Sequence, residues 1–173
     1  QQDALHDYSI GKEIAMVGSA GTGKTMLALY MAFSSLFRPE EFVDHIVIVR
    51  SCVQLRDMGA LPGLLTDKCA PFETPYREIC SYLFGRASTY DDMKDAGIIQ
   101  FASTAFLQGI TFKNSIVILD EIQNCPIEDI NTIMTRIGIG TRVIVTGDSK
   151  QIALTGKGKQ ETSGIYDFLR IAP

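Results

Sequence analysis

The sequence predicts an α/β fold in which a mainly parallel β-sheet is flanked by helices. Short runs of β-branched and aliphatic residues alternate with helical patterns along the chain, as in successive strand–helix–strand units. Four of the five runs are nearly continuously apolar, which is typical of strands covered on both faces. A length of 173 residues fits one domain over residues 1–173. Because the first residue is Gln1 and not Met, we expect that the N-terminus is incomplete.

The elements follow from these patterns in chain order. The predicted strands are 13–17 (EIAMV), 45–49 (HIVIV), 98–101 (IIQF), 115–119 (SIVIL) and 142–145 (RVIV). The predicted helices are 24–37, a segment around 76–84, and 126–136, in which Pro126 can occupy the first turn. Two glycines and three prolines interrupt residues 50–75, so we expect a long loop with short helical pieces there.

Composition excludes several classes of protein. Hydrophobic residues make up 46% and charged residues 21%, as in a globular domain and unlike a disordered or collagen-like chain. The longest charge-free apolar stretch, 25–37, is shorter than the ~20 residues that span a bilayer, so we expect no membrane contact. Four cysteines without a Cys-x-x-Cys pair, and only two histidines, favour reduced thiols in a cytoplasmic protein over a zinc or redox site.

The charge is unevenly distributed along the chain. The net charge of −4 argues against a constitutive nucleic-acid binder. Residues 1–135 carry a net −7, however, whereas residues 136–173 carry +3. A polyanion would therefore approach the C-terminal third.

The strongest motif is GSAGTGKT, which follows the first predicted strand and opens the first predicted helix. It matches the phosphate-binding pattern G-x-x-x-x-G-K-[ST], in which glycines let backbone amides approach the phosphates of ATP. The lysine can bridge the β- and γ-phosphates, and the threonine hydroxyl can ligate Mg²⁺. A dinucleotide-binding GxGxxG would need a third glycine that is missing here. The predicted nucleotide-binding residues are Gly18, Ser19, Ala20, Gly21, Thr22, Gly23, Lys24 and Thr25.

Two carboxylates follow the predicted strand 115–119. We expect Asp120 to hold the Mg²⁺ shell and Glu121 to orient and deprotonate the attacking water. The alternative is that they are acids favoured at a helix N-terminus, which is our interpretation of Glu128 and Asp129. A glutamate after the magnesium aspartate favours an ATPase over a small-molecule kinase, although residues 50–75 could supply the lid that a kinase needs.

Further motifs carry a family resemblance. DEIQN at 120–124 and TGDSKQI at 146–152 resemble motifs II and III of superfamily 1 helicases. LPG at 61–63, TRIGIG at 135–140 and the chain order of all five blocks, beginning with GSAGTGKT, resemble the PhoH family of phosphate-starvation-inducible P-loop ATPases, including its phage-type members. The resemblance implies one RecA-like domain that hydrolyses ATP, and in some relatives an association with RNA unwinding. Many relatives carry Arg-Gly-Arg where this chain has residues 108–110, Gln-Gly-Ile.

The resemblance also implies roles for two glutamines. Gln151 would sense the γ-phosphate, and Gln123 would lie next to the same pocket. Gln1, in the spacing Gln-x-x-Ala-Leu, would read the adenine base, although a solvated terminal residue is an equal alternative.

The remaining expectations concern partners. The site would need an arginine from Arg136 or Arg50, or from a neighbouring subunit, so we expect a homo-oligomeric ring with Arg136 completing the site. Either arginine could instead be an ordinary charge at a helix or strand end. The predicted function is Mg-dependent ATP hydrolysis coupled to translocation on, or unwinding of, RNA or single-stranded DNA. The alternative is an ATP-dependent regulatory or assembly module. Lys150, Lys157 and Lys159 could contact the polynucleotide or form a solvated loop.

Overall fold

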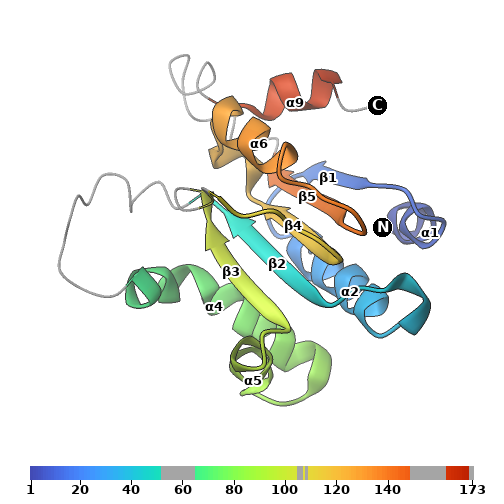
Figure 1. Cartoon of the computed structure of the whole chain (residues 1–173), viewed down its shortest axis with the longest axis vertical. Helices are drawn as coiled ribbons and strands as arrows, with labels where there is room; N and C mark the ends of the chain where they lie inside the picture. The colour runs from blue at the N-terminus through green and yellow to red at the C-terminus, as the bar shows by residue number, and fades with distance from the viewer. Residues whose placement is uncertain (52–64, 105–106, 108, 149–162, 172–173) are drawn as a thin grey trace.

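The computed structural model describes residues 1–51, 65–104, 107, 109–148 and 163–171. Its centre is a five-stranded, all-parallel sheet with helices on both faces, which confirms the predicted α/β fold (Figure 1). The strand order is β1-β5-β4-β2-β3. The strands are β1 Ile14–Gly18, β2 His45–Arg50, β3 Ile99–Ser103, β4 Ser115–Asp120 and β5 Arg142–Asp148.

Two helical layers cover the sheet. The α-helices are α1 Gln2–Ser9, α2 Lys24–Leu36, α4 Leu65–Phe84, α5 Thr89–Asp95, α6 Ile127–Met134 and α9 Ile165–Ile171. Short 3-10 helices, η1 Pro39–Glu41 and η3 Ile122–Asn124, lie between them. One hydrophobic core joins the sheet to α1, α2, α4 and α5, and a second joins it to α6 and α9 (Figure 1).

The central strands β2 and β4 are apolar along their middle four residues because both of their faces are buried. Along β2, Ile46 and Ile48 belong to the core under α2 and α4, whereas Val47 and Val49 belong to the core under α6 and α9. All six residues of β4 are buried in the same way. This two-sided burial is the physical origin of the continuous apolar runs in the sequence.

The predicted helix around 76–84 is part of a longer helix. α4 begins at Leu65, so the prediction of a loop was wrong for residues 65–75, and residues 52–64 of that segment lie outside the described residues. Pro71 and Pro75 lie inside α4, although each removes a backbone donor. The helix continues through them because it is anchored by side chains such as Tyr76 and Glu73, which are at most 1% exposed.

Other helix boundaries also differ from the prediction. Pro126 is the N-cap of α6 and not a residue of its first turn. The sequence patterns gave no indication of α1, α5 or α9, which are each eight residues or shorter. In the described part of the chain, none of the helices has both the length and the apolar character needed to cross a membrane.

The parallel register brings the carboxyl ends of the strands to one edge of the sheet. Gly18 pairs with Asp148, and Arg50 pairs with both Asp120 and Ser103. Open parallel sheets bind their ligands at this edge. The glycine-rich segment and the two carboxylates singled out in the sequence therefore meet on one side of the molecule.

Candidate nucleotide-binding site

The turn between β1 and α2 has the backbone geometry of a phosphate-binding loop. Gly21 and Gly23 adopt positive φ angles of 73° and 79°, which residues with a Cβ rarely adopt. Gly23 is the N-cap of α2, and no described side chain caps this helix end. The first amides of α2 and the positive end of its dipole therefore face the loop, as an anion site requires.

The lysine of the loop curls back over it. The Lys24 Nζ atom donates hydrogen bonds to the carbonyl oxygens of Gly18 at 3.1 Å and Ser19 at 2.7 Å. The Thr22 hydroxyl also donates to the Ser19 carbonyl, at 2.9 Å. This places the ammonium group inside the curve of the loop, where it can meet phosphate oxygens that approach the amides of α2.

The carboxylate of Asp120 is bound by hydroxyl groups from three different elements. Its Oδ1 atom accepts hydrogen bonds from Thr25 of α2, at 3.0 Å, and from Thr146 of β5. Its Oδ2 atom accepts one from Tyr76 of α4, at 2.7 Å. Asp120 is only 3% exposed, so this carboxylate depends on these donors and not on water.

The residues present fit a magnesium ion. Thr25 and Asp120, the two expected ligands, supply hard oxygen atoms side by side at the mouth of the loop. No group of three or more His, Cys, Asp or Glu side chains suited to a metal occurs among the residues that the structure describes. Magnesium matches this sparse set because it is usually held by one or two protein groups together with substrate phosphates and water.

A positive charge lies beside the carboxylates. Arg50 ends β2 directly opposite Asp120, and its guanidinium carbon lies 6.0 Å from the centre of the Phe72 ring. Burial alone would lower the pKa of Arg50, but Tyr76, Asp120 and Glu121 together raise it. Burial and the nearby Asp120 charge raise the pKa of Tyr76 well above its ordinary value. Tyr76 is therefore a neutral donor, and Arg50 is a permanent cation at this edge.

Glu121 has an unusual backbone conformation. Its φ angle of 57° lies in the left-handed region, which is uncommon for a residue other than glycine and occurs often at functional sites. The side-chain amide of Gln123 donates to Glu121 Oε2 and accepts from the backbone N–H of Asp148 at 2.9 Å. Gln123 thus joins the end of β4 to the end of β5. Its expected position next to the γ-phosphate pocket stays a prediction.

Gln1 lies at the phosphate-binding loop. Its side-chain amide donates to the Thr22 carbonyl oxygen at 3.0 Å. A cavity of about 290 Å³ lies beside this contact, between α1, β1 and the loop. It is lined by Gln1, Ala4, Ala15, Met16, Val17, Gly18, Thr22, Lys24 and Leu27.

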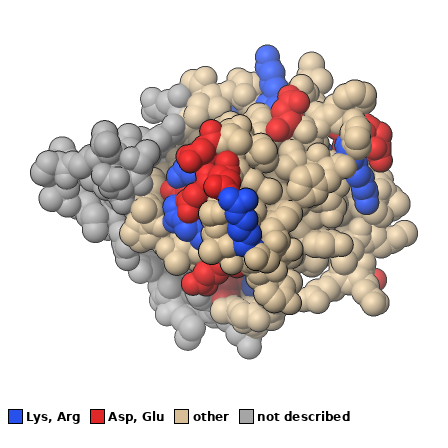
Figure 2. Space-filling view, turned by 90° about the horizontal axis from the view of Figure 1, so that it is seen from below, with Lys and Arg blue, Asp and Glu red and all other residues tan. Residues whose placement is uncertain are grey.

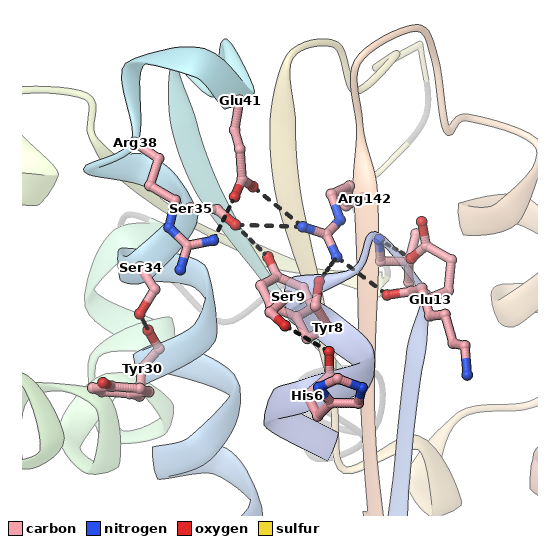
Figure 3. Close-up of polar contacts among 12 residues, drawn as sticks. His6, Tyr8, Ser9, Glu13, Tyr30, Ser34, Ser35, Arg38, Glu41 and Arg142 are labelled. Atoms are coloured by element: carbon pink, nitrogen blue, oxygen red, sulfur yellow. Dashed lines mark hydrogen bonds and ion pairs between the residues drawn. The ribbon is translucent and has the colours of Figure 1, made fainter. Parts of the chain in front are cut away.

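α1, which places Gln1 there, is anchored at its other end by Arg142 (Figure 3). The Arg142 guanidinium donates to the carbonyl oxygens of Tyr8 at 2.7 Å and Lys12 at 3.2 Å, and its carbon lies 3.7 Å from the centre of the Tyr8 ring. It also pairs with Glu41 at 3.2 Å, while the Tyr8 hydroxyl shares a hydrogen bond of 2.9 Å with Ser35. α1 is therefore tied to β5, η1 and α2 by one cation.

Arg136 lies away from this chain's own nucleotide site. It follows α6, and its backbone carbonyl accepts from the Phe112 N–H at 2.9 Å, just before β4 begins. Its Nη1 atom donates to the Ile110 carbonyl oxygen at 3.1 Å. These contacts place Arg136 toward the amino ends of the strands, opposite the phosphate-binding loop.

The remaining motif residues and the lysines expected to contact a polynucleotide lie in parts of the chain that the structure does not describe. Gln151 and the lysines at 150, 157 and 159 lie outside the described residues, as does the LPG motif at 61–63.

Figure 2 views the molecule from the side on which α5 lies in Figure 1, and acidic and basic side chains are mixed on this face. The ion pairs Arg77–Asp91, at 2.9 Å, and Lys94–Glu73, at 2.6 Å, join α4 to α5.

Two residues at the site were given no role from the sequence. Thr146 was named only as the first residue of the TGDSKQI motif, although it directly follows the predicted strand 142–145. Tyr76 had no such signal, since it reaches Asp120 from a helix that is 44 residues away in sequence.

Comparison with known proteins is consistent with this geometry. A family model described as PhoH-like protein matches residues 1–172. The chain belongs to the PhoH family. PhoH-like proteins from Mycobacterium leprae and Synechocystis are 34% and 37% identical to it over 88% and 80% of the chain. Protein PhoH of Escherichia coli K12 is 34% identical over 90% of the chain.

The PhoH assignment confirms the resemblance found in the sequence. The chain spans 42 to 43% of the length of these three relatives. Members of the PhoH family are P-loop NTPases, and the all-parallel sheet with helices on both faces is consistent with a single RecA-like α/β domain.

Proposed function

We propose that the chain hydrolyses ATP with Mg²⁺ at the carboxyl edge of its sheet. The observation that carries the proposal is the 3.0 Å hydrogen bond between Thr25 and Asp120. It joins the phosphate-binding loop to a buried carboxylate that is 95 residues away in sequence. A glycine-rich turn without a role in nucleotide binding does not require a hydrogen bond to a distant buried carboxylate.

The chemistry divides among the residues of the site. Lys24 and the first amides of α2 would hold the phosphates, and Thr25 and Asp120 would hold Mg²⁺, which neutralises phosphate charge when bound. Glu121 would accept a proton from the attacking water. Gln123 supports this role because its amide holds the Glu121 carboxylate at the end of β4. Gln151 remains the proposed γ-phosphate sensor, and Gln1 remains the proposed adenine contact.

Three substitutions test this assignment. Glu121→Gln should bind Mg·ATP but hydrolyse it at least about 100-fold more slowly, since an amide cannot act as a base. Lys24→Ala should lose ATP binding or turnover while keeping its circular dichroism spectrum. Asp120→Asn should weaken the dependence of ATP binding and turnover on magnesium. Glu128→Gln is the matched control, because Glu128 is an exposed acid in the first turn of α6. Parental turnover in Glu121→Gln would exclude Glu121 as the base.

We further propose that an arginine completes the site, either within the chain or from a neighbour. Arg50 is placed to act within the chain, beside Asp120. Arg136 lies toward the opposite edge, so it could serve only the nucleotide of a neighbouring subunit in a head-to-tail ring. Mixing Arg136→Ala chains with Lys24→Ala chains should then restore turnover that neither has alone. Failure to complement, together with full activity of a monomer, would leave Arg50 as the arginine of the site.

The proposed coupling to RNA or single-stranded DNA rests on the family resemblance and on the basic C-terminal third. The rival function is that of an ATP-dependent regulatory or assembly module. For both functions we propose a cytoplasmic location. ATPase rates measured with and without each polynucleotide separate the two. Stimulation by RNA or single-stranded DNA is expected of a translocase, and an unchanged rate is expected of a regulatory module.

A further inference from the structure

Asp120 receives more protein hydrogen bonds than its role as a magnesium ligand requires. A carboxylate offers about four acceptor positions on its two oxygen atoms. Thr25, Thr146 and Tyr76 occupy three of them. This leaves about one acceptor direction for the magnesium shell, and the three donors decide which direction it is.

Tyr76 is built to hold this carboxylate rigidly. Its side chain is completely buried, and its ring packs against Phe101 with centroids 5.9 Å apart. It projects from α4, in the helical layer that covers the sheet, and donates at 2.7 Å to the oxygen that Thr25 and Thr146 leave unbound. Thr146, which is 1% exposed, holds the other oxygen from the neighbouring strand.

We propose that the buried hydroxyls of Tyr76 and Thr146 are positioning residues that set the magnesium affinity of the nucleotide site by fixing the Asp120 carboxylate. The inference rests on the proposed ATPase function and adds Tyr76, which lies outside every motif named in the sequence, and Thr146, the first residue of TGDSKQI. Each hydroxyl donates a hydrogen bond to Asp120 itself. Both act on the metal through Asp120, as groups that orient a metal-binding carboxylate commonly do.

Tyr90 supplies a matched control. It is a second completely buried tyrosine, and its hydroxyl donates at 2.8 Å to the buried carboxylate of Glu73, between α5 and α4. Tyr90→Phe therefore removes the same kind of tyrosine-to-carboxylate hydrogen bond as Tyr76→Phe, although the Tyr76 hydroxyl also contacts the Arg50 side chain. A general loss of stability would appear in both variants, whereas a loss of magnesium affinity should appear only in Tyr76→Phe.

The experiment measures the affinity of a fluorescent, non-hydrolysable ATP analogue during a magnesium titration and again in EDTA. We expect Tyr76→Phe to raise the magnesium concentration for half-saturation by roughly 10-fold or more, the effect typical of groups that orient metal ligands. Its affinity in EDTA should match that of the parental chain. Tyr90→Phe should leave both values unchanged. Thr146→Val should behave like Tyr76→Phe, and it decides the question if Tyr76→Phe lacks a native circular dichroism spectrum.

The possible outcomes separate this inference from the function beneath it. If the parental chain binds the analogue in a magnesium-dependent way, but Tyr76→Phe and Thr146→Val titrate like Tyr90→Phe, the positioning role is refuted and the proposed function stands. If the parental chain itself shows no magnesium-dependent binding, the proposed function fails and this inference fails with it.

Discussion

Replacing Arg142 by methionine should destabilise the fold because one guanidinium joins four elements. The substitution keeps an unbranched aliphatic side chain but removes hydrogen bonds to Tyr8 and Lys12 and the ion pair with Glu41 (Figure 3). It also removes the contact with the Tyr8 ring. Hydrogen bonds to charged groups contribute about 1.5–3 kcal/mol each, and a cation over an aromatic ring about 0.5–2 kcal/mol.

The expected loss is smaller than the sum of these contributions. The Arg142 side chain is 19% exposed, so water screens part of the interaction, and groups in one network are not additive. We expect a loss of about 3 kcal/mol in the free energy of unfolding, a large share of the roughly 5–15 kcal/mol typical of a domain. Urea denaturation followed by circular dichroism measures it.

Arg38→Met is the matched control for this prediction. Arg38 pairs with the same Glu41, at 3.1 Å, but its side chain is 46% exposed. An exposed pair of this kind contributes less than about 1 kcal/mol. Amide hydrogen exchange should accelerate in α1, Gln2–Ser9, in Arg142→Met and stay unchanged in Arg38→Met. Equal and small losses in the two variants would refute the reasoning that Arg142 anchors α1.

Three further predictions concern pH, thiol reactivity and packing. Burial alone would raise the pKa of Glu41, but hydrogen bonds from Ser35 and Arg38 and the charge of Arg142 lower it. Glu41→Gln should therefore cost about 1 kcal/mol at pH 7, and in urea titrations at each pH the difference from the parental chain should shrink as the pH falls through the ordinary glutamate range and vanish below the lowered pKa of Glu41. Burial raises the pKa of Cys80 to about 11, so mass spectrometry should find it unlabelled by iodoacetamide at pH 8 in the native protein and labelled in urea. Gly164→Ala would place a Cβ atom 2.6 Å from the Ile127 Cα atom, and thermal unfolding should show a loss of roughly 1–3 kcal/mol.

Local sequence patterns determined the sheet and the phosphate-binding loop. Short apolar runs, four of them nearly continuous, identified all five strands, because strands buried on both faces carry few polar residues. The glycines of the loop and the pair Asp120–Glu121 were recognisable because their chemistry depends on spacing within a few residues. The assignments of Gln151 and of the LPG motif stay predictions, since they lie outside the described residues.

Only the tertiary structure decided which distant residues meet at the site. The prolines of α4 suggested a loop, yet the packing of buried side chains such as Tyr76 outweighs the missing backbone donors. The contact between Tyr76 and Asp120 then follows from how α4 lies on the sheet, and no local pattern encodes it. The sequence likewise left two candidate arginines and favoured Arg136 over Arg50. The register of β2 with β4 places Arg50 beside Asp120, whereas the direction of α6 carries Arg136 toward the opposite edge.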